Sequence, residues 1–402
     1  MKENNISINK NFNPITPEEI IKILDLTVKK DNHNKLATFL CCLSAYTNDS
    51  QFNISFNAPS SAGKSYIPLE ISNYFPKEDL LILGSCSPTS FFHEQGEYNQ
   101  KTNTTIINLS RKIIIFLDQP DHYLLEKFRP LLSHDKKELI NKITDRKEKG
   151  GHRTKTAIII GYPSVIFCSA SIKIDEQEST RFLMLSPDTN QDKLKESIQT
   201  KITKEANKEV YENNIQNNPE RQTLIDRIEA IKSAKIENII IEQPDLIEKL
   251  FFDSKKKLRP RDQRDIGRFI SLVKCYSLLN LWFRKKVGNN IYANEEDINY
   301  AHDLWSKISV SQELNISPYL YSIFNEIILP LYKEKISNYP DIRIGISRPE
   351  ILKRFFQTYQ YPLPEYKLRQ EILPMLENAG LIVQDYGPDN QQKILIFPNL
   401  NL

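Results

Sequence analysis

The chain has 402 residues, of which 40% are hydrophobic and 26% are charged, and its formal net charge is +3. This length and composition predict a folded protein of two or three domains. No segment approaches the roughly 20 apolar residues that span a bilayer, so we expect no membrane partner. The net charge is too small to indicate a polyanionic partner by itself, so any argument for nucleic acid must be local.

The N-terminus and the cysteines favour a cytoplasmic protein. The first residues, Met1 to Asn5, lack the apolar core of a secretory signal. The five cysteines show no C-x-x-C spacing, so neither a zinc site nor a disulfide framework is expected.

The segment 55–65 predicts a buried strand, a phosphate-binding loop and the start of a helix. Its frame is G-x-x-x-x-G-K-[ST], with Ala58 in place of the first glycine. Gly63 lets backbone N–H groups close on phosphate oxygens, Lys64 reaches the β and γ phosphates, and the Ser65 hydroxyl binds Mg²⁺. The alternative is a chance match in an ordinary strand–turn–helix. The residues predicted to hold ATP are Ala58, Pro59, Ser60, Ser61, Ala62, Gly63, Lys64, Ser65 and Tyr66.

A second apolar run, residues 112–118, predicts a central parallel strand that ends in Asp118. A carboxylate at the C-terminal end of such a strand holds Mg²⁺ together with the serine of the loop. A further strand is expected between the two motifs, at 79–83. Because the two motifs support each other, we expect an α/β core that binds ATP.

The residue after Asp118 is Gln119, where many ATPases of this kind carry a glutamate that activates water. A glutamine amide cannot accept that proton. Three explanations stay open: another carboxylate takes the proton, Gln119 only orients the water, or hydrolysis is slow. The candidate carboxylates are Asp121, Glu126 and Glu94.

A basic hairpin is predicted around Gly150 and Gly151, which favour a tight turn. Such a loop can neutralise the phosphates of DNA. The alternative is a charged hairpin that is only solvated. The basic residues near the turn are Arg146, Lys147, Lys149, His152, Arg153 and Lys155.

Residues 165–171 predict another buried strand, which ends in small hydroxyl residues. Ser169 or Ser171 is a candidate sensor of the γ-phosphate, and the alternative is an ordinary turn serine. Arg181 lies beside the next apolar strand and is a candidate arginine finger for a neighbouring subunit. A finger acts in trans, so the active unit would be an oligomer.

Residues 191–310 are rich in helix formers, and the segment 264–272 has apolar residues at i, i+3 and i+4. Asn294 is the expected N-cap of a further helix. We therefore expect a small helical lid domain in this part of the chain.

The C-terminal part predicts a winged helix. Its expected elements are a helix at 348–360, a helix at 365–378 with Gly380 as its C-cap, and a hairpin of strands at 381–385 and 393–397. The alternative to DNA binding is a contact with another protein. The candidate DNA contacts in this part are Lys367, Arg369 and Lys393.

The order of these motifs resembles that of AAA+ ATPases, and within them the minichromosome-maintenance-like helicases of chromosomes and mobile elements. The resemblance covers roughly residues 57–308. The segment 118–121 lies where that family has Asp-Glu-x-Asp, and 180–182 lies where it has the Ser-Arg-Phe of its finger. The basic segment 147–156 is similar to the family's pre-sensor hairpin, which grips DNA in the channel of the ring.

The family's lid helix opens with Arg-Gln-Leu-Glu, and Arg264 lies at that arginine. The resemblance therefore implies that Arg264 is the second sensor, which closes the lid. Arg261 and Arg268 are alternatives, and each arginine could instead lie on an exposed helix face. The resemblance further implies a ring, a hexamer in the family, that translocates on or unwinds single-stranded or forked DNA in the replication of a mobile element.

The predicted fold is an α/β P-loop NTPase core of the AAA+ type with an α-helical lid and a C-terminal winged helix. The first 48 residues are too few for the oligonucleotide-binding domain of such helicases, so a separate loader or primase is expected. The expected domains are an N-terminal helical segment at 1–48, the core at 49–190, the lid with its linker at 191–315 and the winged helix at 316–402.

Two other functions stay open. A nucleotide-switched DNA-binding or signalling ATPase would have the same domains without helicase activity; Gln119 favours it and the basic hairpin disfavours it. A scaffold that binds no nucleotide is disfavoured by the intact Gly63-Lys64-Ser65 and by Asp118.

Overall fold

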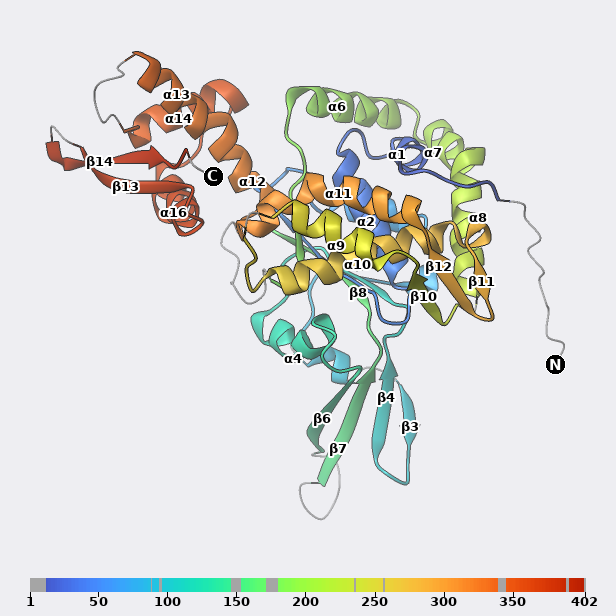
Figure 1. The fold of residues 1–402 in the computed structure, drawn as a ribbon. Coiled ribbons are helices and arrows are strands. Elements are labelled where there is room, and N and C mark those ends of the chain that lie inside the picture. Colours follow the sequence, from blue (N-terminus) through green and yellow to red (C-terminus); the bar gives the residue numbers. More distant parts are fainter. Residues whose placement is uncertain are drawn as a thin grey trace.

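The computed structural model describes residues 12–87, 89–93, 96–145, 153–170, 180–234, 236–255, 257–338, 345–387 and 390–400. A central sheet with helices around it forms the main body, long hairpins project from one end, and a C-terminal unit lies to one side (Figure 1). Within these ranges, no helix has both the length and the apolar character needed to cross a bilayer.

The central sheet has five parallel strands in the order β2-β5-β8-β1-β9. It confirms the expected α/β core and the strands predicted from the apolar runs. The register pairs Asn57 with Ser169 and Phe116 with Phe167, so the carboxyl ends of three neighbouring strands meet at one edge. The strands are β1 (Ile54–Asn57), β2 (Leu80–Leu83), β5 (Ile113–Phe116), β8 (Ser164–Ser169) and β9 (Leu183–Leu185).

Both faces of this sheet are covered, which explains why its central strands are continuous apolar runs. On β5, Ile113 and Ile115 belong to one hydrophobic core, whereas Ile114 and Phe116 belong to another. The second core includes α4 and the turn η2. The elements flanking the sheet are α1 (Pro17–Leu24), α2 (Asn32–Ser44), α3 (Tyr66–Ser72), α4 (His122–Leu132) and the 3₁₀ turns η1 (Lys77–Asp79) and η2 (Ser90–His93).

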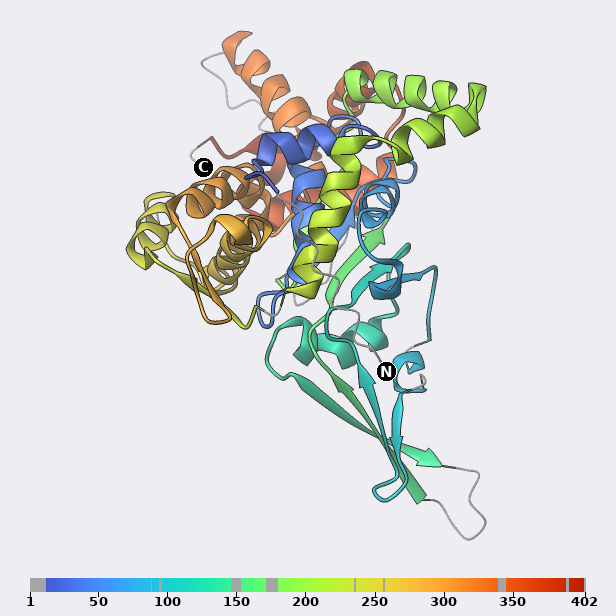
Figure 2. The same ribbon diagram turned by 90° about the vertical axis from the view of Figure 1, so that its right-hand side faces the viewer.

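A second sheet, in the order β3-β4-β7-β6, carries the two projecting hairpins (Figure 2). The antiparallel pairing of β6 with β7 confirms the strands of the predicted basic hairpin, whose turn lies outside the described residues. The hairpin of β3 and β4, which joins β7 in parallel, was not predicted. The strands are β3 (Glu97–Asn99), β4 (Thr104–Asn108), β6 (Glu138–Asp145) and β7 (Arg153–Ile160).

The part after β9 is mainly helical, as predicted. Asn294 caps α11 in a capping box with Asp297, as its sequence position indicates. The helices are α6 (Gln191–Ala206), α7 (Lys208–Gln216), α8 (Pro219–Ser233), α9 (Pro244–Asp253), α10 (Asp262–Leu279) and α11 (Glu295–Glu313), with a 3₁₀ turn η3 (Leu281–Phe283).

A small sheet in the order β10-β12-β11 lies among these helices and was not predicted. Its strands are short: β10 (Asn238–Ile241), β11 (Lys286–Val287) and β12 (Asn290–Ala293). The parallel pair β10–β12 joins segments about fifty residues apart, which no local pattern indicates.

One hydrophobic core joins one face of the central sheet to α1, α2 and the helices α8–α11. Leu24 and Leu40 from the N-terminal segment and Phe269 from α10 are fully buried in this core. The expected N-terminal segment and lid therefore pack as one body with the sheet, although their boundaries stay predictions.

The C-terminal unit has its own hydrophobic core. Ser347 and Glu350 form a capping box at α14, Gly380 has a φ of 75°, and the antiparallel pair β13–β14 follows, all as the sequence indicates. The elements are α12 (Pro318–Ser322), a π-helical segment η4 (Ile323–Ile328), α13 (Leu329–Asn338), α14 (Arg348–Tyr359), α15 (Glu365–Lys367), a π-helical segment η5 (Leu368–Ile372), α16 (Leu373–Asn378), β13 (Ile382–Gly387) and β14 (Asn390–Pro398).

Candidate functional site

The loop 58–65 connects β1 to α3, and two of its residues have a left-handed backbone. Ser61 has a φ of 67° and Gly63 a φ of 88°. A Cβ at Gly63 would meet no heavy atom within 4 Å, so the glycine is required by its backbone conformation and not by crowding. Alternating right- and left-handed residues turn successive N–H groups toward one point, which is an arrangement that binds anions.

Lys64 lies folded over this loop. Its Nζ donates a hydrogen bond of 2.7 Å to the Pro59 carbonyl oxygen. Burial lowers the pKa of Lys64, and the nearby Cys168 and Asp118 act in the opposite direction. The strand order β5-β8-β1 brings the ends of the two predicted motifs to the same edge of the sheet.

Three candidate residues lie at the ends of neighbouring strands. The Ser169 hydroxyl donates to the Gln119 side-chain oxygen at 2.7 Å, and the Gln119 N–H donates to Asp118 at 2.8 Å. The structure thus joins Ser169 at the end of β8 to Gln119, which follows β5, because β5 and β8 are neighbouring strands. Ser171 lies outside the described residues.

The candidate general bases differ in their surroundings. Asp121 is the N-cap of α4, where its carboxylate accepts a hydrogen bond of 2.8 Å from the Tyr123 N–H. Glu126 is exposed on α4, and Glu94 lies outside the described residues. Asp121 therefore has a structural role that its sequence position did not indicate.

We expect Asp121→Ala to lower the free energy of unfolding by about 1 kcal/mol, because the first turn of α4 loses its cap. Asp121→Asn removes the proton acceptor but keeps a good N-cap, so its stability should equal that of the wild type. Chemical unfolding and ATP turnover of both variants test this. An Asp121→Asn protein as unstable as Asp121→Ala would contradict the capping role. An Asp121→Asn protein that is stable but inactive would identify Asp121 as the base that takes the proton of the attacking water.

A cavity of about 630 Å³ opens beside the loop. Its walls include Gly63 of the loop, Tyr66 and Glu70 of α3, and Tyr211 of α7. Burial raises the pKa of Glu70. The cavity combines aromatic, apolar and polar walls next to the loop 58–65, which is the character of a small-ligand site.

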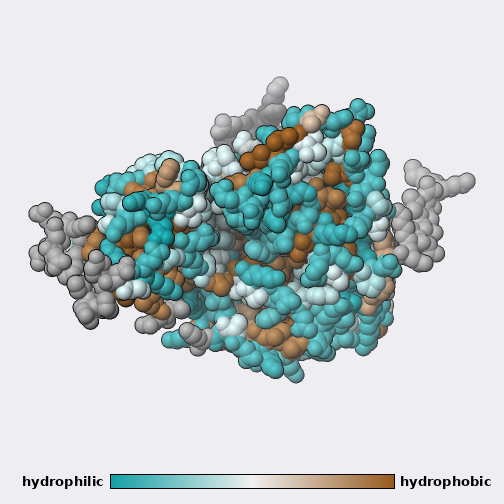
Figure 3. Space-filling model, turned by 90° about the horizontal axis from the view of Figure 1, so that it is seen from above, coloured by the Kyte–Doolittle hydropathy of each residue, from teal (hydrophilic) through white to brown (hydrophobic). Residues whose placement is uncertain are grey.

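Helix α6 forms one side of this cavity, with Lys201 and Lys204 among the lining residues. The same helix carries Leu194, Ile198 and Ile202, which are 40, 59 and 63% exposed, and Leu194 also lines the cavity. The view from above shows hydrophobic residues in an oblique streak on the upper face of the molecule (Figure 3). The i, i+4, i+8 spacing makes a continuous apolar stripe.

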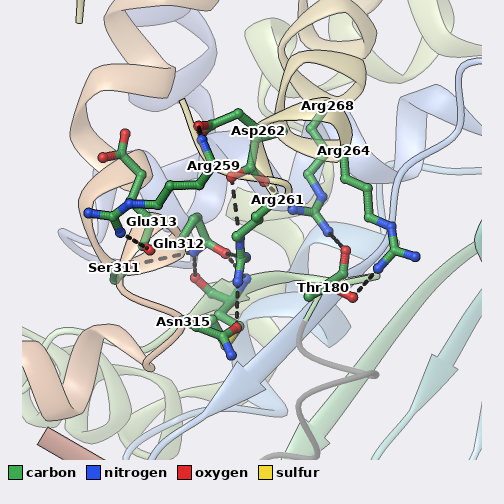
Figure 4. Close-up of polar contacts among 12 residues, drawn as sticks. Thr180, Arg259, Arg261, Asp262, Arg264, Arg268, Ser311, Gln312, Glu313 and Asn315 are labelled. Carbon is green, nitrogen blue, oxygen red and sulfur yellow. Dashed lines mark hydrogen bonds and ion pairs between the residues drawn. The ribbon is translucent and has the colours of Figure 1, made fainter. Parts of the chain in front are cut away.

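Arg181 and Arg264 line a different cavity, of about 350 Å³, together with Ser133, Arg268 and Lys274. None of its lining residues belongs to 58–66 or to 118–119. The structure therefore brings Arg264 to Arg181, and does not bring it to the candidate phosphate loop. The Arg181 Nε donates to the Ser133 hydroxyl at 2.9 Å, and Arg264 donates to the Thr180 hydroxyl (Figure 4).

The two alternatives to Arg264 are not on an exposed helix face. The side chains of Arg261 and Arg268 are only 10 and 8% exposed, and both form ion pairs with Asp265. Burial lowers the pKa of Arg268 to about 10, against the opposing effect of Asp265. Sequence reasoning missed Asp265, although its i+4 and i−3 spacing to the two arginines was a usable signal.

The basic hairpin is described only at its strands. Lys155 lies in β7 with its Nζ 5.5 Å from the centre of the Tyr98 ring, a cation–π contact between the two hairpins. Arg153 is the first residue of β7, but its side chain and all of His152 lie outside the described residues, as does the Lys393 side chain. Tyr98, 54% exposed, was not predicted as part of this surface.

The chain matches no protein-family model, and no curated protein matches it. The fold is therefore the basis for assigning the chain to a class of protein. It is an α/β protein with a five-stranded parallel sheet and flanking helices, an architecture compatible with nucleotide binding.

Proposed function

We propose that the protein is a Mg²⁺-dependent ATPase whose nucleotide phosphates bind the loop 58–65. The observation that carries this proposal is the conformation of the loop, with Ser61 and Gly63 left-handed and Lys64 folded over it. A loop of this kind offers several N–H groups to one phosphate. The adjoining cavity of about 630 Å³ offers space for the nucleoside.

In the proposal, Lys64 exchanges the Pro59 carbonyl for the β and γ phosphates, and Ser65 and Asp118 hold Mg²⁺. A hydroxyl and a carboxylate are hard oxygen ligands that suit this ion. Within the described ranges, no group of three or more His, Cys, Asp or Glu residues forms a metal site. Mg²⁺ usually keeps several waters and binds through one or two carboxylates plus substrate phosphates, so in the proposal phosphates and water would complete its coordination. Bound Mg²⁺ supplies charge neutralisation at the phosphates.

Ser169 and Gln119 act on the attacking water in this proposal. The Ser169 hydroxyl fixes the Gln119 side chain through their 2.7 Å hydrogen bond. A glutamine held in one orientation suits a residue that positions water by hydrogen bonding and does not take its proton.

The active unit in the proposal is an oligomer, in which Arg181 and Arg264 act on the nucleotide of a neighbouring subunit. Support comes from the separation of the two cavities: the arginines line one, and the phosphate loop lines the other. The separation of the two cavities disfavours the alternative, in which Arg264 closes the lid onto the nucleotide of its own subunit. A ring, which is a hexamer in the family that the chain resembles, would place a neighbouring subunit's arginines beside each nucleotide.

The proposed substrate of the motor is DNA, single-stranded or forked. Support comes from the projecting hairpins, where Lys142 and Lys155 lie on β6 and β7 and Tyr98 offers an exposed aromatic ring. Cationic and aromatic side chains together bind single strands without reading their sequence. A role in replicating a mobile element, with a loader or primase, is proposed from the resemblance alone.

We expect single-stranded DNA to stimulate ATP turnover, and Arg153→Ala/Lys155→Ala to abolish the stimulation without changing the basal rate. The reason is that each lost cation weakens phosphate binding in a salt-dependent way. Steady-state phosphate release with and without DNA is the measurement. Lys136→Ala/Lys137→Ala, two exposed lysines just before β6, is the charge-matched control. Stimulation that survives in the hairpin variant, or disappears equally in the control, would contradict the proposal.

A second candidate is a nucleotide-switched DNA-binding or signalling ATPase. Gln119 in place of the usual glutamate is the observation that favours it. Such a protein binds ATP tightly and turns it over slowly whether or not DNA is present. The same assay therefore separates the two candidates.

A further inference from the structure

Asp265 is a fully buried carboxylate on α10 that is shared by two arginines. One of its oxygens accepts from the Arg261 Nε at 3.2 Å, and the other accepts from the Arg268 Nη1 at 2.5 Å. A buried charge is stable only when it is paired and hydrogen-bonded. The three side chains therefore form one unit, whose geometry the carboxylate fixes.

The Arg268 side of this unit reaches the residue directly before Arg181. The second terminal nitrogen of Arg268 donates to the Thr180 carbonyl oxygen at 2.5 Å. Arg264, on the next turn of the same helix, donates to the Thr180 hydroxyl (Figure 4). Two arginines of α10 thus hold one end of the segment that carries Arg181.

The Arg261 side reaches the other end of that segment. Arg261 donates to the Gln312 side-chain oxygen at 3.2 Å and to the Asn315 side chain at 2.5 Å. The Gln312 amide, fully buried on α11, in turn bonds the backbone of Met184 in the edge strand β9, accepting from its N–H at 3.0 Å and donating to its carbonyl at 2.6 Å. The segment 180–184 is therefore anchored at both ends, and both anchors lead to Asp265.

We propose that Asp265 is a positioning residue for catalysis in trans: through Arg268 and Arg261 it fixes the segment 180–184, so that Arg181 and Arg264 meet the γ-phosphate in a neighbouring subunit. This proposal rests on the proposed ATPase function. The carboxylate touches no substrate and acts through the arginines. Its removal changes where the two catalytic cations lie, and leaves the phosphate loop of the same subunit intact.

The test is ATP binding and turnover by the full-length Asp265→Asn variant. Asparagine keeps the shape of the side chain but loses its charge. We expect an unchanged Kd for ATP and a turnover at saturating ATP that is about 100-fold lower, the usual cost of misplacing a catalytic group by about 1 Å. Asp265→Glu, which keeps the charge, should recover part of the turnover. Mixing Asp265→Asn with Lys64→Ala subunits should also restore turnover, because each supplies the part that the other lacks.

Two further variants separate positioning from stability. Arg268→Lys keeps the charge but lacks the planar guanidinium that bridges Asp265 and Thr180, so it should also lose turnover. This variant tests the positioning role if Asp265→Asn folds poorly. Asp297→Asn is the matched control, since Asp297 is equally buried and pairs with Arg284 at 2.7 Å without a bond to 180–184. The control should lose stability but keep turnover per folded molecule.

The outcomes distinguish the two proposals. A wild type that turns over ATP, with Asp265→Asn and Arg268→Lys as active as Asp297→Asn, overturns the positioning role and leaves the ATPase. A loss of turnover that mixing with Lys64→Ala does not restore also overturns it. A wild type that neither binds nor hydrolyses ATP overturns the proposed function itself.

Discussion

Lys64→Ala is expected to abolish ATP binding and to lower turnover at least about 100-fold. A positioned cation that meets phosphate charge is worth about 3 kcal/mol in the transition state, and alanine leaves nothing in its place. The side chain is half-buried, and its hydrogen bond to the Pro59 carbonyl oxygen lies within the loop itself, so the fold should tolerate the change. Equilibrium binding of labelled ATP and steady-state phosphate release measure the two effects.

The matched control is Lys77→Ala, which removes an exposed lysine next to the same central sheet. It should behave as the wild type in both assays. Normal ATP binding by Lys64→Ala would show that the loop 58–65 does not hold the phosphates. That result would contradict the proposed nucleotide site. Equal losses in Lys64→Ala and Lys77→Ala would point to a general effect of charge.

The central sheet could be predicted because its signals are local. Strands such as Ile113–Phe116 are buried on both faces and are therefore continuous apolar runs. Helix ends were predicted equally well, since a capping residue such as Asn294 bonds within its own first turn. In each case the interaction that forms the element lies within a few residues of it.

The elements that were missed depend on distant partners. Strand β4 is a short Thr- and Ile-rich segment, a composition that favours strands, but its pairing with β7 joins residues about fifty positions apart. The three-residue strand β3 has only its hairpin partner. Short polar strands of this kind take their structure from the sheet they join.

The same limit applies to the candidate site. Motif spacing predicted Ser169 and Gln119 separately, and the strand order explains why their side chains meet. For the arginines, the family resemblance implied Arg264, with Arg261 and Arg268 as alternatives. The burial of Arg268 and its bond to Thr180 depend on a contact between α10 and the segment before β9, 88 residues earlier in the chain, which no local pattern indicates.

The third cation of this group, Arg181, makes the sharpest test of an oligomeric active unit. Arg181→Ala should lower turnover about a thousandfold, the usual effect of removing an arginine finger. ATP binding should be unchanged, because the cavity of Arg181 includes no residue of 58–66. The Ser133 hydroxyl, which accepts from the Arg181 Nε at 2.9 Å, can bond water instead, so we expect the fold to hold.

A mixing experiment then decides between action in cis and action in trans. Arg181→Ala subunits have an intact phosphate loop but lack Arg181, and Lys64→Ala subunits have Arg181 but lack the lysine of the loop, so each alone should hydrolyse ATP only slowly. In a mixed assembly the two meet at shared interfaces, and turnover should return there. Arg348→Ala, which removes a surface arginine paired with Glu365 at 3.2 Å, is the control and should be fully active alone. A mixture as inactive as its two components would contradict catalysis in trans, and with it the requirement for a ring.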